Sequence, residues 1–156
     1  MASAGIQMGM ARMTPCYNRK RAEAPRDEQN PRKVFICSPF HPVGETKAEI
    51  EEDLKQNLER AKLACRAALD RGYVPYAPHL YFPQFLSEDD ADEREMGIIL
   101  GLTWLARCDE LWVIGTRISE GMKKELAMAH EWGIPIKFML MVKADGERKV
   151  RIYGEY

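Results

Sequence analysis

A carboxylate lies where the sequence pattern favours an apolar residue. Residues 119–132 have the periodicity of a short amphipathic helix, and Glu125 falls inside its apolar arc. The apolar members of this arc are Met122, Leu126, Met128, Ala129 and Trp132. A lone carboxylate that faces a protein core is costly unless it is ion-paired, protonated or used chemically. Glu125 is therefore either the partner of a buried Arg or Lys or a candidate functional residue.

The segment before this helix is a typical place for a ligand in an α/β protein. Residues 110–115 predict a strand, and the loop that follows Gly115 leads directly into the helix. Ligands of open α/β sheets bind where strands lead into such loops. We therefore expect Glu125 to lie beside a binding site.

Strand and helix patterns alternate along the rest of the chain. Thr46 and Glu49 form a capping box, which begins a long helix that ends near Arg71, before Gly72. Asp89 or Asp90 can cap a second helix, which runs through Arg107. We expect the first helix to be buried through Ile50, Leu54, Leu58, Ala61, Cys65, Ala68 and Leu69, and the second through Met96, Ile99, Leu100, Trp104 and Leu105. Further strands are predicted at residues 34–37, 73–76 and 134–140, with a last edge strand at 150–153 after a turn at 144–147.

This alternation predicts a three-layer α/β/α sandwich around a mainly parallel sheet of four to five strands, of the flavodoxin or Rossmann-like kind. The ligand crevice of such a sheet lies at the carboxyl ends of its first and third strands. Two loops converge there, at residues 38–44 and 116–121.

Composition limits the class of protein. The chain has 156 residues, of which 46% are hydrophobic and 30% charged, so residues 33–156 are expected to form one domain, preceded by a flexible tail at 1–32. The net charge of −1 does not favour a nucleic acid polymer or an anionic membrane as partner. No apolar run is long enough to span a membrane, and no signal-peptide pattern is present, which favours a cytoplasmic location. The four cysteines lie far apart, so buried thiols are expected rather than disulfides or a metal site.

Four segments resemble the nucleoside 2-deoxyribosyltransferase superfamily, which includes nucleoside 5′-monophosphate N-glycosidases and uncharacterised phage and bacterial proteins. The resemblance covers about residues 33–140. The similar segments are Val34-Phe35-Ile36-Cys37-Ser38-Pro39-Phe40, Gly72-Tyr73-Val74-Pro75 with Pro78-His79-Leu80, Trp104-Leu105-Ala106-Arg107-Cys108-Asp109, and Ser119-Glu120-Gly121-Met122-Lys123-Lys124-Glu125-Leu126.

The resemblance implies that Glu125 is a nucleophile, which attacks the anomeric carbon of a nucleoside or nucleotide and displaces the base. Ser119 would help to hold a 5′-phosphate at the helix start, although an N-cap is the commonest role of Ser at such a position, and Ser119 can equally be only that. Gly121 would let the backbone approach the ligand closely. The resemblance implies a homo-oligomer and no cofactor.

The resemblance also names residues for the opposing wall of the site. Ser38, Pro39 and Phe40 would form this wall. His79 would contact the base or, alternatively, form a hydrogen bond within its loop. Asp109 is a further substrate-binding candidate. It precedes a strand, however, and can instead cap the end of the preceding helix or bond to a loop, and we favour this structural role.

Two departures from the family pattern leave the activity open. The family's candidate general acid, an Asp, is replaced by Gly101, and Asp92 or Glu95 earlier on the same helix would have to substitute for it. A Tyr that orients the nucleophile is replaced by Phe35. A general acid is worth about 10²–10⁴ in rate. The expected function is thus an N-glycosidase or deoxyribosyltransferase, with a non-catalytic nucleotide-binding module or a protein-interaction domain as alternatives.

Overall fold

A five-stranded sheet forms the centre of the protein. The computed structural model describes residues 30–155, and in this part the strands lie in the order β2-β1-β3-β4-β5. The first four strands are parallel, and β5 pairs antiparallel with β4. The strands are β1 (Lys33–Cys37), β2 (Val74–Tyr76), β3 (Glu110–Ile114), β4 (Ile136–Ala144) and β5 (Glu147–Glu155).

The strand order reverses between β1 and β3, as in flavodoxin-like sheets. In such a sheet the loops after these two strands diverge to opposite faces, which opens a crevice at their carboxyl ends. The prediction of an α/β protein with a mainly parallel sheet of five strands is confirmed.

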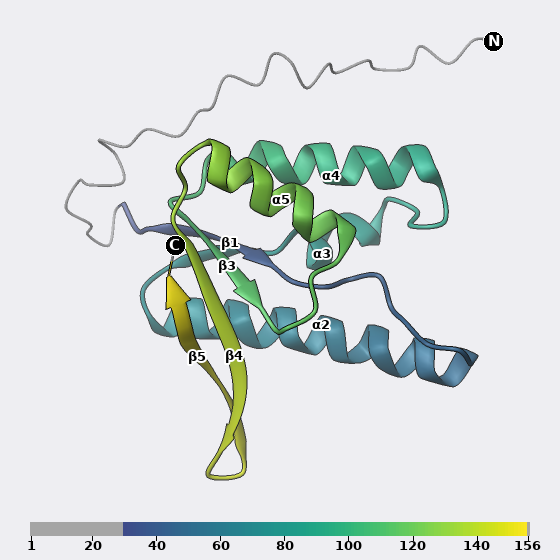
Figure 1. The fold of residues 1–156 in the computed structure, drawn as a ribbon, viewed down its shortest axis with the longest axis horizontal. Coiled ribbons are helices and arrows are strands. Elements are labelled where there is room, and N and C mark those ends of the chain that lie inside the picture. Colours follow the sequence, from purple (N-terminus) through teal and green to yellow (C-terminus); the bar gives the residue numbers. More distant parts are fainter. Residues whose placement is uncertain (1–29, 156) are drawn as a thin grey trace.

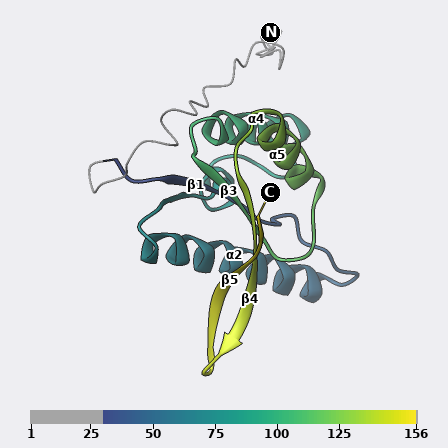
Figure 2. The ribbon, with the colours of Figure 1, turned by 60° about the vertical axis from the view of Figure 1, so that its left-hand side comes forward.

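Helices cover both faces of the sheet, which makes the three layers visible in Figures 1 and 2. One face is covered by α4 and α5, and the other by α2. The short helices α3 and η2 follow β2 near the carboxyl edge of the sheet. The helices are α2 (Lys47–Asp70), α3 (Pro78–Tyr81), η2 (Phe82–Gln84), α4 (Ala91–Leu105) and α5 (Glu120–Glu131).

The buried face of α2 differs from the predicted one. The capping box of Thr46 and Glu49 is present, but Ile50 and Leu69 are exposed. Ala61 and Ala68 are buried as predicted, and Asn57 and Ala64 are buried in addition. Small side chains face the sheet here because Trp112 of β3 fills the space between the two layers.

The buried face of α4 was also predicted only in part. Asp90 caps this helix, and Leu105 is buried as expected, whereas Met96 and Trp104 are exposed. Gly101 and Leu102 are buried in their place. The observed buried faces of α2 and α4 both turn toward the sheet. The positions of the large apolar residues alone do not predict these faces.

The chain ends in a β4–β5 hairpin that extends past α2 (Figure 1). Its tight turn consists of Asp145 and Gly146, which both have positive φ, as the type of turn that joins paired strands most often requires. The predicted turn is confirmed, but both strands are longer than the sequence pattern indicated.

The packed part of the chain begins just before the predicted boundary at Lys33. Arg32 forms an ion pair with Glu110 at 3.1 Å, so this residue belongs to the domain rather than to the predicted tail. The predicted tail comprises residues 1–32, and its residues 1–29, which include Cys16, lie outside the described residues. Within residues 30–155, no helix is long and apolar enough to cross a membrane.

Candidate active site

The helix α5 places Glu125 against the carboxyl end of β1. Ser119 caps this helix by accepting a hydrogen bond from the backbone N–H of Met122, which confirms its N-cap role. Glu125 lies on the same face as the buried Met122, one turn before it, and Ala129, one turn after it. Its side chain is 5% exposed. The helical spacing of these residues is therefore what brings a carboxylate into the core.

Glu125 makes no ion pair with any described residue. One hydrogen bond reaches its carboxylate, from the thiol of Cys37, and Oε2 has no hydrogen-bond partner. Burial raises the pKa of Glu125 to about 7, and the Cys37 hydrogen bond opposes this shift. Within residues 30–155, the alternative of a buried salt bridge is therefore wrong for Glu125.

The buried salt bridge is found at a different carboxylate. Glu110, at the amino end of β3, lies 3.1 Å from Arg32 and 3.0 Å from Lys137. It also accepts hydrogen bonds from the phenol of Tyr73 and the indole of Trp112. Burial raises its pKa, but the bonds from Trp112 and Lys137 outweigh burial, so the pKa of Glu110 is lowered. Glu110 is fully satisfied, and Glu125 is not.

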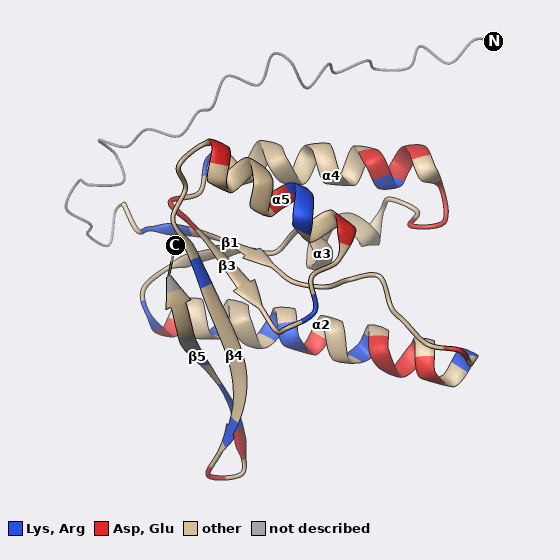
Figure 3. Cartoon of the chain, viewed as in Figure 1, with Lys and Arg blue, Asp and Glu red and all other residues tan. Residues whose placement is uncertain are grey.

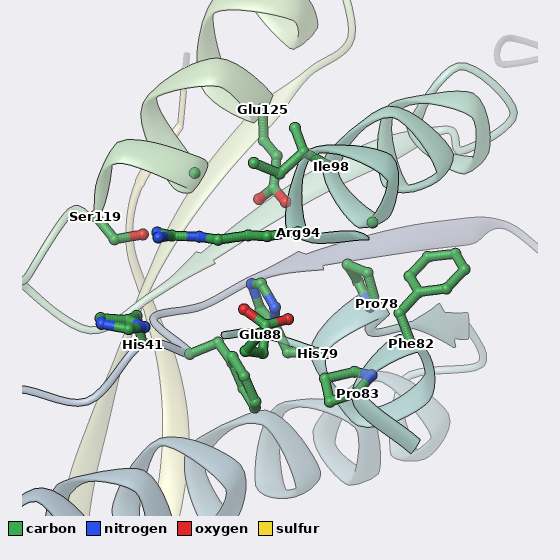
Figure 4. A pocket seen from close by; sticks show the side chains of 13 residues that line it. His41, Pro78, His79, Phe82, Pro83, Glu88, Arg94, Ile98, Ser119 and Glu125 are labelled. Atoms are coloured by element: carbon green, nitrogen blue, oxygen red, sulfur yellow. The ribbon is translucent and has the colours of Figure 1, made fainter. Parts of the chain in front are cut away.

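A pocket opens beside Glu125 at the crevice that the sheet topology predicts. Figure 4 shows the carboxylate of Glu125 and the side chains of Arg94 and Glu88 in this pocket. The volume of this cavity is about 70 Å³, which is several times the volume that one water molecule needs. Its lining consists of Phe40, His41, Pro78, His79, Phe82, Pro83, Glu88, Arg94, Gly97, Ile98, Ser119, Gly121 and Glu125. We call this the Glu125 pocket.

An aromatic pair forms the wall opposite α5. Phe40 and His79 stack with ring centroids 5.3 Å apart and planes 12° from parallel. The imidazole of His79 forms a hydrogen bond with the backbone of Ser38, just after β1, so the bond joins two segments that are distant in sequence rather than lying within one loop as the alternative predicted, and His79 also lines the pocket. Burial lowers the pKa of His79 to about 4, so its ring is neutral at pH 7.

The structure brings together five of the eight predicted site residues, namely Phe40, His79, Ser119, Gly121 and Glu125. Ser38 is fully buried next to them, at the end of β1, and its hydroxyl has no hydrogen-bond partner. Pro39 does not line the Glu125 pocket and instead lines a second pocket on the α2 side of the sheet, because successive residues of an extended chain point to opposite faces.

Asp109 is separated from the pocket by the length of the sheet. It accepts a hydrogen bond from the backbone N–H of Lys33 at 2.8 Å, at the amino ends of β1 and β3. The favoured structural role of Asp109 agrees with this position. Its alternative role in substrate binding does not, since the pocket lies at the carboxyl ends of these strands.

Sequence reasoning missed the two charged residues that enter the pocket from the start of α4. Arg94 lies on the first turns of this helix, four residues before Ile98, which also lines the pocket. Glu88 lies in the loop before the helix, where no periodic pattern marks it. The residues predicted in their place, Asp92 and Glu95, do not line the pocket. For Arg94, the spacing to Ile98 was the available signal.

Side chains suited to a metal ion do not gather in the described residues, where no group of three or more His, Cys, Asp or Glu has the required arrangement. The polar groups that line the Glu125 pocket include Glu125, Glu88, Arg94 and the helix start at Ser119.

These features define a flavodoxin-like α/β protein with a buried carboxylate beside the point where the strand order of the sheet reverses, between β1 and β3. The chain belongs to the family described as Domain of unknown function (DUF7768), whose model matches residues 32–139. Among solved structures it is similar to a 2-deoxyribosyltransferase from the psychrotolerant bacterium Bacillus psychrosaccharolyticus. The TM-score is 0.52 at 18% sequence identity, over 69% of this chain and 72% of the other, which establishes a common fold. No curated protein matches the chain.

Proposed function

We propose that this protein is an N-glycosidase or deoxyribosyltransferase that acts on nucleosides or nucleoside 5′-monophosphates, with Glu125 as the nucleophile. The observation that carries this proposal is that Oε2 of Glu125 has no hydrogen-bond partner, although the residue is only 5% exposed. This oxygen belongs to a side chain that lines a pocket where the strand order of the sheet reverses. A buried carboxylate without a compensating charge is costly, and such groups are concentrated at functional sites. The similar solved structure is described as a biocatalyst for the synthesis of nucleosides, which supports the same substrate class.

The first step would form an ester between Glu125 and the sugar. The carboxylate attacks C1′, and the bond between C1′ and the base nitrogen breaks, so that its electron pair leaves with the base. In the second step water or another base attacks C1′ and releases Glu125. Water gives hydrolysis, and a second base gives transfer.

The leaving base needs a proton, and Glu88 is our candidate for supplying it. Gly101 stands where the similar family carries its acid, and it lies in the core against Pro78 and Phe35. Glu88 is the second carboxylate that lines the Glu125 pocket, and Figure 4 shows it across the pocket from Glu125. It would protonate the base in the first step and accept the proton of the attacking water in the second.

The remaining lining would position the substrate. Phe40, stacked on His79, offers an aromatic surface for the base. Arg94 and the backbone N–H groups at the start of α5 offer charge and donors to a 5′-phosphate. Figure 4 shows the guanidinium of Arg94 extended toward Ser119, so both groups would serve the same phosphate.

Base release tests this proposal. The pure protein is incubated with deoxynucleosides and with their 5′-monophosphates, and free base is separated by chromatography, with Glu125→Ala as control. We expect release that is absent from the variant. No release above the variant, with purine and pyrimidine substrates alike, would overturn it.

A non-catalytic nucleotide-binding module is the second candidate, and Gly101 and Phe35 favour it because each lacks a polar group that the similar family carries. Such a module would be stabilised against heat by a nucleotide but would release no base. Thermal unfolding with and without nucleoside monophosphates separates the two candidates.

A further inference from the structure

A second pocket lies on the opposite face of the sheet from Glu125. It is enclosed by α2, the loops after β1 and β3, and the β4–β5 hairpin. Its open space is about 460 Å³, within the range of ligand-binding clefts. Its lining consists of Pro39, Val43, Asp53, Gln56, Arg60, Ile114, Gly115, Thr116, Arg117, Leu140, Met141, Val142, Lys143 and Arg148. We call this the hairpin pocket.

Positive charge accumulates in the hairpin pocket. Arg60, Arg117, Lys143 and Arg148 line it from four different parts of the chain, against the single carboxylate of Asp53. The lining thus has a net charge of +3 in a chain whose net charge is −1. In Figure 3, basic segments are visible on α2, on the loop before α5 and toward the tip of the hairpin.

Most of this charge has no counter-charge within the described residues. Arg117 is the exception, since its guanidinium lies 3.2 Å from Asp53. Arg60 donates a hydrogen bond to the amide oxygen of Asn57 at 3.0 Å, which fixes the guanidinium in place without neutralising it. Neither Lys143 nor Arg148 forms an ion pair in residues 30–155.

The strand register brings two of these cations together. Lys143 and Arg148 are direct partners across the hairpin, so their side chains leave the same face of the sheet. Like charges directly opposite one another destabilise a strand pair. An anion that bridges the two side chains would remove this repulsion.

From this convergence we propose that the hairpin pocket binds a diphosphate group, either as free pyrophosphate or as part of a nucleotide. Guanidinium groups form paired, charge-assisted hydrogen bonds with phosphate oxygens, and two linked phosphates match the several uncompensated cations better than one. The volume and the apolar side chains of Ile114 and Met141, which face α2, leave room for an organic moiety beside the phosphates. This site is separate from the Glu125 pocket and does not depend on the function proposed for it.

The test measures binding of inorganic pyrophosphate and of a nucleoside diphosphate to the full chain by isothermal titration calorimetry. Arg60→Gln and Arg148→Gln should each weaken pyrophosphate binding about tenfold, as the loss of a charge-assisted hydrogen bond implies. Lys149→Gln is the matched control, because it removes one positive charge from the next residue of β5, which does not line the pocket. Arg107→Gln is a second control, because Arg107 lines neither pocket and bonds to the backbone of its own helix.

We expect both controls to bind within about twofold of the unaltered protein. Tighter binding of the nucleoside diphosphate would identify a nucleotide as the source of the diphosphate group, and equal binding would identify free pyrophosphate. Absence of binding at millimolar pyrophosphate, or an equal loss in Lys149→Gln or Arg107→Gln, would overturn the proposal. Circular dichroism of Arg60→Gln and Arg148→Gln verifies that they are folded, and Lys143→Gln replaces either variant that is not.

Discussion

The thiol of Cys37, at the carboxyl end of β1, donates a hydrogen bond to the carboxylate of Glu125 on α5. Burial raises the pKa of this thiol well above its ordinary value, and the charge of Glu125 raises it further, so the thiol keeps its proton. One oxygen of Glu125 remains without a partner. The hydrogen bond from Cys37 thus orients the carboxylate of Glu125 and leaves its second oxygen available to a ligand.

Replacing Glu125 by Gln should stabilise the protein more at high pH than at low pH. The pKa of Glu125 is raised from 4.5 to about 7 on folding, so the folded state holds a proton that the unfolded state has lost, and stability falls as pH rises through this window. The advantage of Glu125→Gln in free energy of unfolding should grow by about 2–3 kcal/mol between pH 5 and pH 8. Urea unfolding at both pH values measures it.

Glu110→Gln is the matched control, because the pKa of Glu110 is lowered on folding. Its ionised form stabilises the folded state above the unfolded pKa, and this contribution disappears as pH falls. The variant should therefore be strongly destabilised at pH 8 and less so at low pH. The same pH trend in both variants would contradict the assignment of an unpaired Glu125.

Removing the Cys37 hydrogen bond should shift the pH dependence of activity. This bond lowers the pKa of Glu125, so Cys37→Ala should raise that pKa and move the acidic limb of kcat/KM to higher pH, by about one unit at most. Cys65→Ala is the control, since this thiol lies on α2, on the other face of the sheet. An unchanged limb in Cys37→Ala would show that Glu125 does not set it.

Arg94→Gln should discriminate between substrates with and without a 5′-phosphate. We expect KM for nucleoside monophosphates to rise about tenfold or more, because a charge-assisted hydrogen bond is lost, while KM for nucleosides stays the same. Arg107→Gln, just beyond the other end of α4, serves as control because Arg107 bonds to the backbone of its own helix. Equal effects on both substrate classes would remove Arg94 from the phosphate site.

Glu88→Gln tests the proposed acid. With natural bases kcat should fall by about 10²–10⁴, the usual contribution of a general acid. With a substrate whose leaving group needs no proton, the fall should be small. Glu95→Gln, an exposed residue of α4 outside the pocket, should leave both rates unchanged. A loss in Glu88→Gln that is the same for both leaving groups would rule out proton transfer.

The sequence pattern was sufficient for the order of strands and helices, because each element has its own periodicity and its own end signals. Thr46, Asp90 and Gly133 mark ends that the structure places within a residue or two. Glu125 was visible for the same reason, as a break in a helical pattern. Strands and helices alternate along the chain, and right-handed crossovers between parallel strands then leave few possible topologies.

What the pattern missed depends on contacts between distant parts of the chain. Ala64 faces the sheet because Trp112 of β3 occupies that layer, which is not visible within α2 itself. Glu88 and Arg94 enter the Glu125 pocket only because α4 packs beside α5. Pro39 and Phe40 are neighbours in sequence but line pockets on opposite faces of the sheet.

The most direct test of the central claim is a search for a covalent sugar on Glu125. The protein is quenched with acid during turnover of a deoxynucleoside monophosphate or a deoxynucleoside with a good leaving group, and its intact mass and peptides are measured by mass spectrometry. We predict a mass increase of one sugar unit, located on the peptide that contains Glu125 and absent from Glu125→Gln. Base release that proceeds with no such adduct, and that Glu125→Gln carries out at the rate of the unaltered protein, would contradict the assignment of Glu125 as nucleophile.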